Sequence, residues 1–161
     1  MSIQIGQPLP DVEIKAIVDG RIEATRTGTL FAGRKAVLFA VPGAFTPTCS
    51  EKHLPGYVQQ HEVFRARGIA VYCLAVNDAY VMQAWAAAQQ VPPDLLLLAD
   101  GNASFTRALD LERDGSAYGM GLRARRFALY AEDGVVRQLH VEAPGEFRVS
   151  GAEAVLAALG G

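Results

Sequence analysis

Cysteine is scarce in this 161-residue chain, which holds only Cys49 and Cys73. Two cysteines are too few for the disulfide scaffold of a small secreted domain, and they suit a reducing compartment in which thiols react. The start of the chain lacks the basic and apolar parts of a signal peptide, and no apolar stretch approaches the roughly 20 residues that span a bilayer. We therefore expect a soluble, unprocessed, cytoplasmic protein.

A strong charge of either sign is also absent. The net charge is -2 and the lysines do not cluster, which argues against binding to nucleic acid or to an anionic membrane. His53, His61 and His140 lack a metal-ligand spacing such as H-E-x-x-H, so we expect them to be structural or surface groups. No G-x-G-x-x-G, phosphate-binding loop or G-x-S-x-G occurs, which disfavours nucleotide-binding and serine-hydrolase functions.

Apolar runs bounded by turn residues alternate with helical patterns, which is typical of an α/β sheet in one domain spanning residues 1–161. After a short N-terminal strand or loop, the pattern predicts strands at 36–41, 69–76 and 95–99, helices at 51–67, 79–90 and 152–159, and an antiparallel hairpin of 126–130 and 135–141. Pro55 and Gly56 should kink the first helix, and Ser150 with Glu153 forms a capping box for the last. The sequence therefore predicts a mixed central sheet flanked by helices.

The segment VPGAFTPTCSEKHLPGY, residues 41–57, is the most informative part of the chain. A proline and a glycine end the preceding strand, and Thr46 followed by Pro47 indicates a helix start with proline at the first helical position. Cys49 then falls in the first turn. Unpaired backbone N–H groups and the positive end of the helix dipole stabilise a thiolate there, which makes Cys49 the leading candidate for the reactive residue.

A redox cysteine where a strand of a mixed sheet meets a helix is a thioredoxin-like arrangement. In the C-x-x-C spacing of that fold, Thr46 occupies the place of the first sulfur, so a disulfide within the motif is impossible. The sequence closely resembles the peroxiredoxins, whose P-x-x-x-T-x-x-C motif is matched by Pro42, Thr46 and Cys49. The longer strings PGAFTPTCS, HLPGY, CLAVNDAYVMQAW and RARRFALYAEDG resemble the type-5 (type II) subfamily along essentially the whole chain.

This resemblance implies a thiol-dependent peroxidase that reduces hydrogen peroxide and small organic hydroperoxides through a sulfenic acid at Cys49. It implies that Thr46 and Arg126, the arginine before the phenylalanine of the hairpin, shape the pocket, and we expect Pro42 to shield the site from bulk water. An external thiol then regenerates the enzyme, either glutathione with glutaredoxin or thioredoxin. We expect no metal, haem or flavin.

Activation of the thiol alone cannot explain a fast peroxidase. A thiol with an ordinary pKa of about 8.5 is only about 3% thiolate at pH 7, so full ionisation gains about 30-fold. Nucleophilicity falls with pKa, and a three-unit drop costs about 20-fold. The larger effect must be stabilisation of charge across the breaking O–O bond. We expect the Thr46 hydroxyl, the Cys49 backbone N–H and the Arg126 guanidinium to hold both peroxide oxygens in line with sulfur.

Other functions and contacts remain open at this point. Cys73 lies in an apolar run, where a buried structural cysteine is the ordinary outcome, and no cysteine follows it that could act as a C-terminal resolving residue. Alternatives are a thiol-disulfide oxidoreductase using Cys49 and Cys73, and a redox-sensing or chaperone-like interaction module. The resemblance also implies a homodimer, with Phe45 and Tyr80 as candidate contact residues.

Overall fold

A seven-stranded sheet forms the centre of the protein, of which the structure, a computed structural model, describes residues 2–160. Its strands are β1 (Glu13–Val18), β2 (Arg21–Arg26), β3 (Lys35–Ala40), β4 (Ile69–Ala75), β5 (Leu95–Ala99), β8 (Phe127–Glu132) and β9 (Val135–Val141). A separate hairpin consists of β6 (Glu112–Asp114) and β7 (Leu122–Ala124). The α-helices are α1 (Thr27–Phe31), α2 (Leu54–Ala66), α3 (Ala79–Ala88), α4 (Ser104–Leu109) and α5 (Ala152–Leu159).

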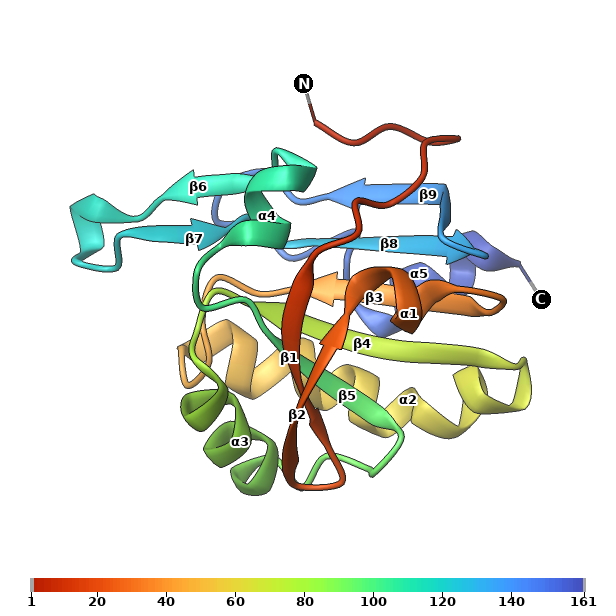
Figure 1. Ribbon diagram of the computed structural model, residues 1–161, viewed down its shortest axis with the longest axis horizontal. Coiled ribbons are helices and arrows are strands. Elements are labelled where there is room, and N and C mark those ends of the chain that lie inside the picture. The colour runs from red at the N-terminus through yellow and green to blue at the C-terminus, as the bar shows by residue number, and fades with distance from the viewer. Residues whose placement is uncertain (1, 161) are drawn as a thin grey trace.

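The sheet is mixed, as predicted. Its strand order is β2-β1-β5-β4-β3-β8-β9, with β3, β4 and β5 parallel and the remaining pairs antiparallel. The N-terminal region forms a full hairpin, β1–β2, beside β5, where only a short strand or a loop was expected. The β6–β7 hairpin projects beyond the sheet (Figure 1). It connects α4 to β8 and ends shortly before Arg126, the predicted arginine, which precedes β8.

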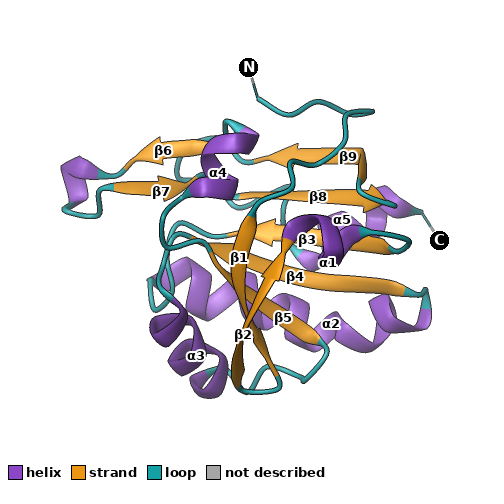
Figure 2. Ribbon diagram, in the orientation of Figure 1, coloured by secondary structure: helices purple, strands orange, loops and turns teal. Residues whose placement is uncertain are grey.

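Helices cover both faces of the sheet, and alternate strand residues point into two cores. Phe39 packs on the face covered by α2, α3 and α5, whereas its neighbour Leu38 packs on the face covered by α1 and α4. Figure 2 shows α1 and α4 on the near side of the sheet and α2 and α5 behind it. This three-layer arrangement confirms the predicted α/β, thioredoxin-like fold class.

The β8–β9 hairpin turns as predicted, with positive φ at both Asp133 (49°) and Gly134 (75°), as a type I′ turn requires. The strand itself begins at Phe127, one residue later than expected. Ala128 shares the core on the α2 side with Phe39. Continuing the two-residue alternation backwards places Arg126 at the same face, just before the strand begins.

The predicted capping box at the start of α5 is wrong. The N-cap residue is Gly151, without a side-chain cap bond, and the Ser150 hydroxyl donates instead to the Glu142 carboxylate, at 2.7 Å. Glu142 follows β9 and lies next to Ser150 only in the folded protein. A tertiary acceptor has therefore displaced the local one that the spacing with Glu153 suggested.

The helix before the second parallel strand is also less regular than predicted. Residues Cys49–His53 form a π turn, closed by a bond from the Leu54 N–H to the Cys49 carbonyl, and α2 follows directly. Pro55 lies in the first turn of α2, where its missing N–H is tolerated. The irregularity thus precedes the predicted kink at Pro55 and Gly56, and it contains the candidate cysteine.

Candidate active site

Cys49 lies in the first helical turns after a short loop that leaves β3. The loop is tied to its surroundings because the Ala44 N–H donates to Asn77 Oδ1, at 2.9 Å, and the Thr46 hydroxyl donates to the Gly43 carbonyl, at 2.7 Å. Helical structure begins at residue 47, as predicted, and the Ser50 N–H donates to the Thr46 carbonyl at 2.9 Å. Within residues 2–160, no acceptor lies opposite the Cys49 N–H. This donor is therefore available beside a buried sulfur.

Arg126 contacts this sulfur directly. Its Nη2 lies 3.1 Å from Cys49 Sγ, and its Nη1 lies 2.7 Å from His53 Nδ1. Strand register explains the meeting: Ala40, the last residue of β3, pairs with Phe127, the first of β8. Arg126 therefore lies beside the point where the chain leaves β3 toward Cys49. The predicted arginine and the predicted cysteine, 77 residues apart in sequence, are brought together.

His53 positions the arginine, a role that the sequence interpretation missed. Its Nε2 lies 3.0 Å from the Ser150 carbonyl, which can only accept, so Nε2 carries the proton and Nδ1 offers a lone pair to Arg126. Burial first, and then the charge of Arg126, lower the pKa of His53 to about 3. The neutral imidazole thus orients the guanidinium without cancelling its charge. The signal available in the sequence was the spacing of His53 from Cys49, close to one helical turn.

A buried carboxylate holds the other side of this histidine. Glu142 accepts the backbone N–H groups of Arg148, Val149 and Ser150 at 2.8–2.9 Å, together with the Ser150 hydroxyl. Burial would raise the pKa of Glu142, but these hydrogen bonds outweigh it and lower the pKa. The Ser150 carbonyl is thereby fixed in place. It accepts from both His53 and the Tyr57 hydroxyl, the latter at 2.7 Å.

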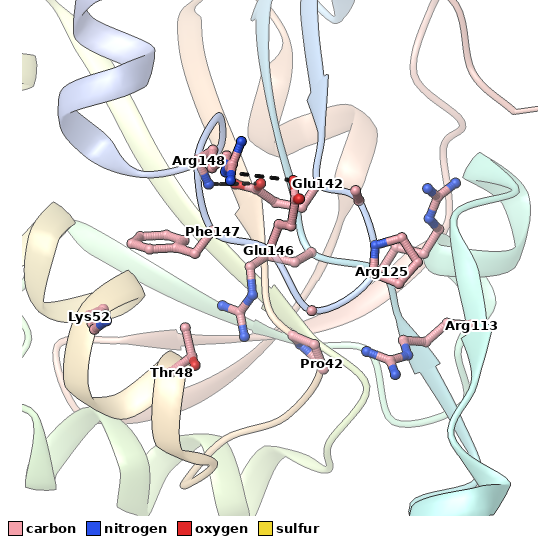
Figure 3. Close-up of a pocket in the computed structure, with 13 residues that line it drawn as sticks. Pro42, Thr48, Lys52, Arg113, Arg125, Glu142, Glu146, Phe147 and Arg148 are labelled. Carbon is pink, nitrogen blue, oxygen red and sulfur yellow. Dashed lines mark hydrogen bonds and ion pairs between the residues drawn. The ribbon is translucent and has the colours of Figure 1, made fainter.

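A pocket of about 580 Å³ (Figure 3) opens next to the chain segment that carries Cys49, although the buried Cys49 itself does not line it. Pro42 and Thr48 line it on the side of the Cys49 loop, and Arg126 reaches it from the start of β8. Phe147 forms an apolar wall, with the Arg126 Cζ 5.9 Å from its ring centre. The structure thus places Pro42 and Arg126 at one opening, with Thr46 in the turn that leads to the cysteine.

Cys73 is as fully buried as Cys49, but its surroundings favour the neutral thiol. It lies in the middle of β4, paired with Phe39 of β3, and is completely buried in the same core cluster as Cys49. Burial, and then the nearby Cys49, raise the pKa of the Cys73 thiol well above its usual value. Both cysteines are unpaired thiols.

The other predicted structural groups have ordinary partners. His61 Nε2 lies 2.6 Å from Asp94, and His140 Nε2 lies 2.9 Å from Gln138. Within residues 2–160, no group of three or more His, Cys, Asp or Glu side chains could hold a metal ion. Nor does this part of the chain contain a helix long and apolar enough to cross a membrane.

Comparison with known proteins assigns the family. The family model described as Redoxin matches residues 4–156. Peroxiredoxin-2C of Oryza sativa subsp. japonica is 43% identical, over 98% of this chain and 98% of its own length. The chain belongs to the peroxiredoxin family. This peroxiredoxin is also 49% identical to the chloroplastic peroxiredoxin-2E-2 of the same species, over 98% of this chain and 73% of that protein.

Solved structures agree with this assignment. Reduced Prx3 of Vibrio vulnificus in complex with H2O2 is 49% identical to this peroxiredoxin, with a TM-score of 0.91 over 98% of this chain and 99% of that one. The resemblance seen in the sequence motif is therefore confirmed. Family membership makes the protein a thiol-dependent peroxidase.

Replacement of His53 should separate its positioning role from packing. His53→Phe keeps a ring but removes the acceptor for Arg126, and we expect Cys49 oxidation by hydrogen peroxide to slow about 10-fold, since a hydrogen bond to a charged group contributes about 1.5 kcal/mol. His53→Asn, whose Oδ1 can replace Nδ1, should recover most of the rate. Stopped-flow fluorescence of Trp85, whose indole N–H donates to the Ser50 hydroxyl next to Cys49, reports the reaction. Equal losses in both variants would show that His53 only packs.

His53 also predicts a pH dependence of stability. Because its pKa is about 3 when folded and 6.5 ordinarily, the unfolded chain binds a proton that the folded chain does not over this range. The contribution to the free energy of unfolding is complete above pH 6.5 and falls by about 1.4 kcal/mol per pH unit below it. Urea unfolding at pH 7, 6 and 5 should show that His53→Asn loses stability less steeply than the wild type. Parallel curves would contradict this assignment.

Proposed function

We propose that this peroxiredoxin reduces hydrogen peroxide and small organic hydroperoxides with Cys49 as the attacking thiolate. The observation that carries the proposal is the 3.1 Å contact between Arg126 Nη2 and Cys49 Sγ. A guanidinium keeps its charge at every physiological pH, so it favours the thiolate and remains available when charge moves onto oxygen. Pro42, at the rim of the adjacent pocket, limits access of bulk water to this pair.

The proposed step transfers one oxygen atom to sulfur. A sulfur lone pair forms the S–O bond, the O–O bond breaks, and the departing oxygen takes a proton and leaves as water or an alcohol. The Thr46 proton is already donated to the Gly43 carbonyl, so its oxygen lone pairs are left to accept from the peroxide O–H. Arg126 and the Cys49 N–H supply donors for the oxygen on which charge develops. This refines the role that the sequence suggested for Thr46.

We also propose that an external thiol reduces the sulfenic acid. Cys73 is a poor internal reductant because burial, and then the nearby Cys49, raise the pKa of its thiol and so disfavour the thiolate. Glutathione with glutaredoxin, or thioredoxin, remain the candidate donors. Two unpaired thiols suit a reducing compartment, and the cytoplasm is our proposed location.

The raised pKa of Cys73 weighs against a dithiol oxidoreductase that would use Cys49 and Cys73. A redox sensor without turnover would not need an arginine held beside the sulfur by a neutral histidine. These contacts favour catalysis over both alternatives.

A homodimer contact is proposed at one exposed apolar surface. Phe45 is 56% exposed and Tyr80 is 77% exposed, high values for large apolar side chains. Their segments are linked because Ala44, next to Phe45, donates to Asn77, shortly before Tyr80. Burial of this surface by a second copy would also stabilise the loop that carries Thr46.

Intact-mass measurement tests the proposed function. After one equivalent of hydrogen peroxide, wild type and Cys73→Ser should each gain one oxygen atom, whereas Cys49→Ser should gain none. Excess glutathione should remove the added oxygen and support turnover. Loss of two hydrogens in the wild type, through a Cys49–Cys73 bond, would instead support the dithiol oxidoreductase.

The role of Thr46 can be separated from thiol activation. Thr46→Val should slow the reaction with hydrogen peroxide about 100-fold, the size expected when a contact that orients the reacting atoms is lost. Alkylation by iodoacetamide, which has no O–O bond, should change far less. Thr46→Ser keeps the hydroxyl and serves as the matched control. Equal losses with both reagents would refute the assignment.

A further inference from the structure

We propose that the pocket beside Cys49 binds small, negatively charged thiols and selects the reductant by its charge. The inference rests on the proposed function and names the class of thiol that serves it. Lys52 and Arg113 lie on opposite sides of this pocket, with Pro42 between them (Figure 3). Arg125 lines it from the side of the β6–β7 hairpin, next to Arg126.

These four cationic side chains have no acidic partner. Within residues 2–160, no carboxylate forms an ion pair within 4.0 Å of Lys52, Arg113, Arg125 or Arg126. Some arginines elsewhere on the same molecule are paired, as Arg26 is with Asp11 at 3.2 Å. Four unpaired cationic side chains therefore line one pocket of a chain whose net charge is -2.

The two carboxylates that line the pocket offset its positive charge only in part, because the lining also holds five cations: Lys52, Arg113, Arg125, Arg126 and Arg148. Glu142 accepts three backbone N–H groups and the Ser150 hydroxyl, so its oxygens are already occupied. Glu146 lies 3.9 Å from Arg148, a further arginine at the rim. A concave site with one sign of uncompensated charge attracts ions of the other sign and raises their local concentration. The electrostatics therefore favour an anionic ligand.

The size and position of the pocket favour a thiol as this ligand. Hydrogen peroxide is neutral and has only two heavy atoms, so it needs neither a volume of about 580 Å³ nor four cations. The reductant must approach the same sulfur, and it reacts as a thiolate, itself an anion. The Phe147 ring offers an apolar surface for the carbon chain of such a molecule, while the cations contact its acidic group.

The reaction at this site balances with two thiols for each peroxide. The first thiolate attacks the sulfenic sulfur of Cys49, the S–S bond forms, the S–O bond breaks, and the departing hydroxide takes a proton to become water. The second thiolate attacks the outer sulfur of this mixed disulfide. It releases the Cys49 thiolate and the oxidised disulfide of the two small thiols. The pocket acts on the first attack by holding the thiol next to Cys49.

A charge series of small thiols tests the inference. 2-Mercaptoethanesulfonate, 2-mercaptoethanol and cysteamine share a two-carbon chain and carry a negative, neutral and positive group, respectively. Cys49 is first oxidised with hydrogen peroxide, and the rate of its reduction by each thiol is followed by Trp85 fluorescence. Arg113→Gln/Arg125→Gln is compared with wild type, because neither side chain makes a hydrogen bond or ion pair within residues 2–160. Ratios of variant to wild type cancel the intrinsic reactivity of each thiol.

We expect the double variant to reduce about 10-fold more slowly with 2-mercaptoethanesulfonate, whose reacting form carries two negative charges, with a smaller loss for 2-mercaptoethanol and the smallest loss for cysteamine. The loss should shrink in high salt, where pocket charges are screened. Arg21→Gln/Arg65→Gln removes the same charge at exposed sites and should not reproduce the effect. Equal changes with all three thiols, or an equal loss in that control, would overturn the inference. Failure of peroxide to oxidise Cys49 in the wild type would instead refute the proposed function.

Discussion

The active site depends on one guanidinium that contacts a thiol and an imidazole at the same time. Arg126 donates to Cys49 Sγ through Nη2 and to His53 Nδ1 through Nη1. Because the guanidinium is planar and rigid, holding one nitrogen fixes the direction of the other. A lysine in this position would offer a mobile point charge instead. The position of the positive charge beside sulfur is therefore set by the contact that Arg126 makes on its far side.

His53, which contacts Arg126 on the side away from sulfur, is neutral, and its neutrality affects the chemistry of the site. A carboxylate could also orient an arginine, but it would cancel much of the charge that stabilises a thiolate and a departing oxygen. His53 orients the guanidinium as an uncharged acceptor, since its pKa is far below neutrality. The nearby carboxylate, Glu142, acts one step away, through the loop that presents the Ser150 carbonyl. The site thus gains rigidity without losing positive charge.

In the pocket lined by Pro42 and Arg126, some other cationic side chains of the described chain are likewise not paired with a carboxylate. Glu142 is occupied by loop hydrogen bonds, and Arg113 and Arg125 have no acidic partner among residues 2–160. Unpaired like charges close together oppose folding, so they indicate a ligand rather than a contribution to stability. The β6–β7 hairpin, which projects beyond the sheet and brings Arg113 to the pocket, has this role in addition to connecting α4 with β8 (Figure 1).

Local sequence patterns determined the central strands, the turn at Asp133 and the helix start before Cys49, because each depends on residues close together in the chain. The family motif, formed by Pro42, Thr46 and Cys49, is also a local pattern of the sequence. Only the tertiary structure decided the role of His53, which lies 73 residues from Arg126 and 97 from Ser150. It likewise replaced the expected cap of α5 by a bond from Ser150 to the carboxylate of Glu142, eight residues earlier, just after the end of β9. Strand register and loop closure bring such groups together, and no short-range pattern records which buried acceptor a polar side chain will meet.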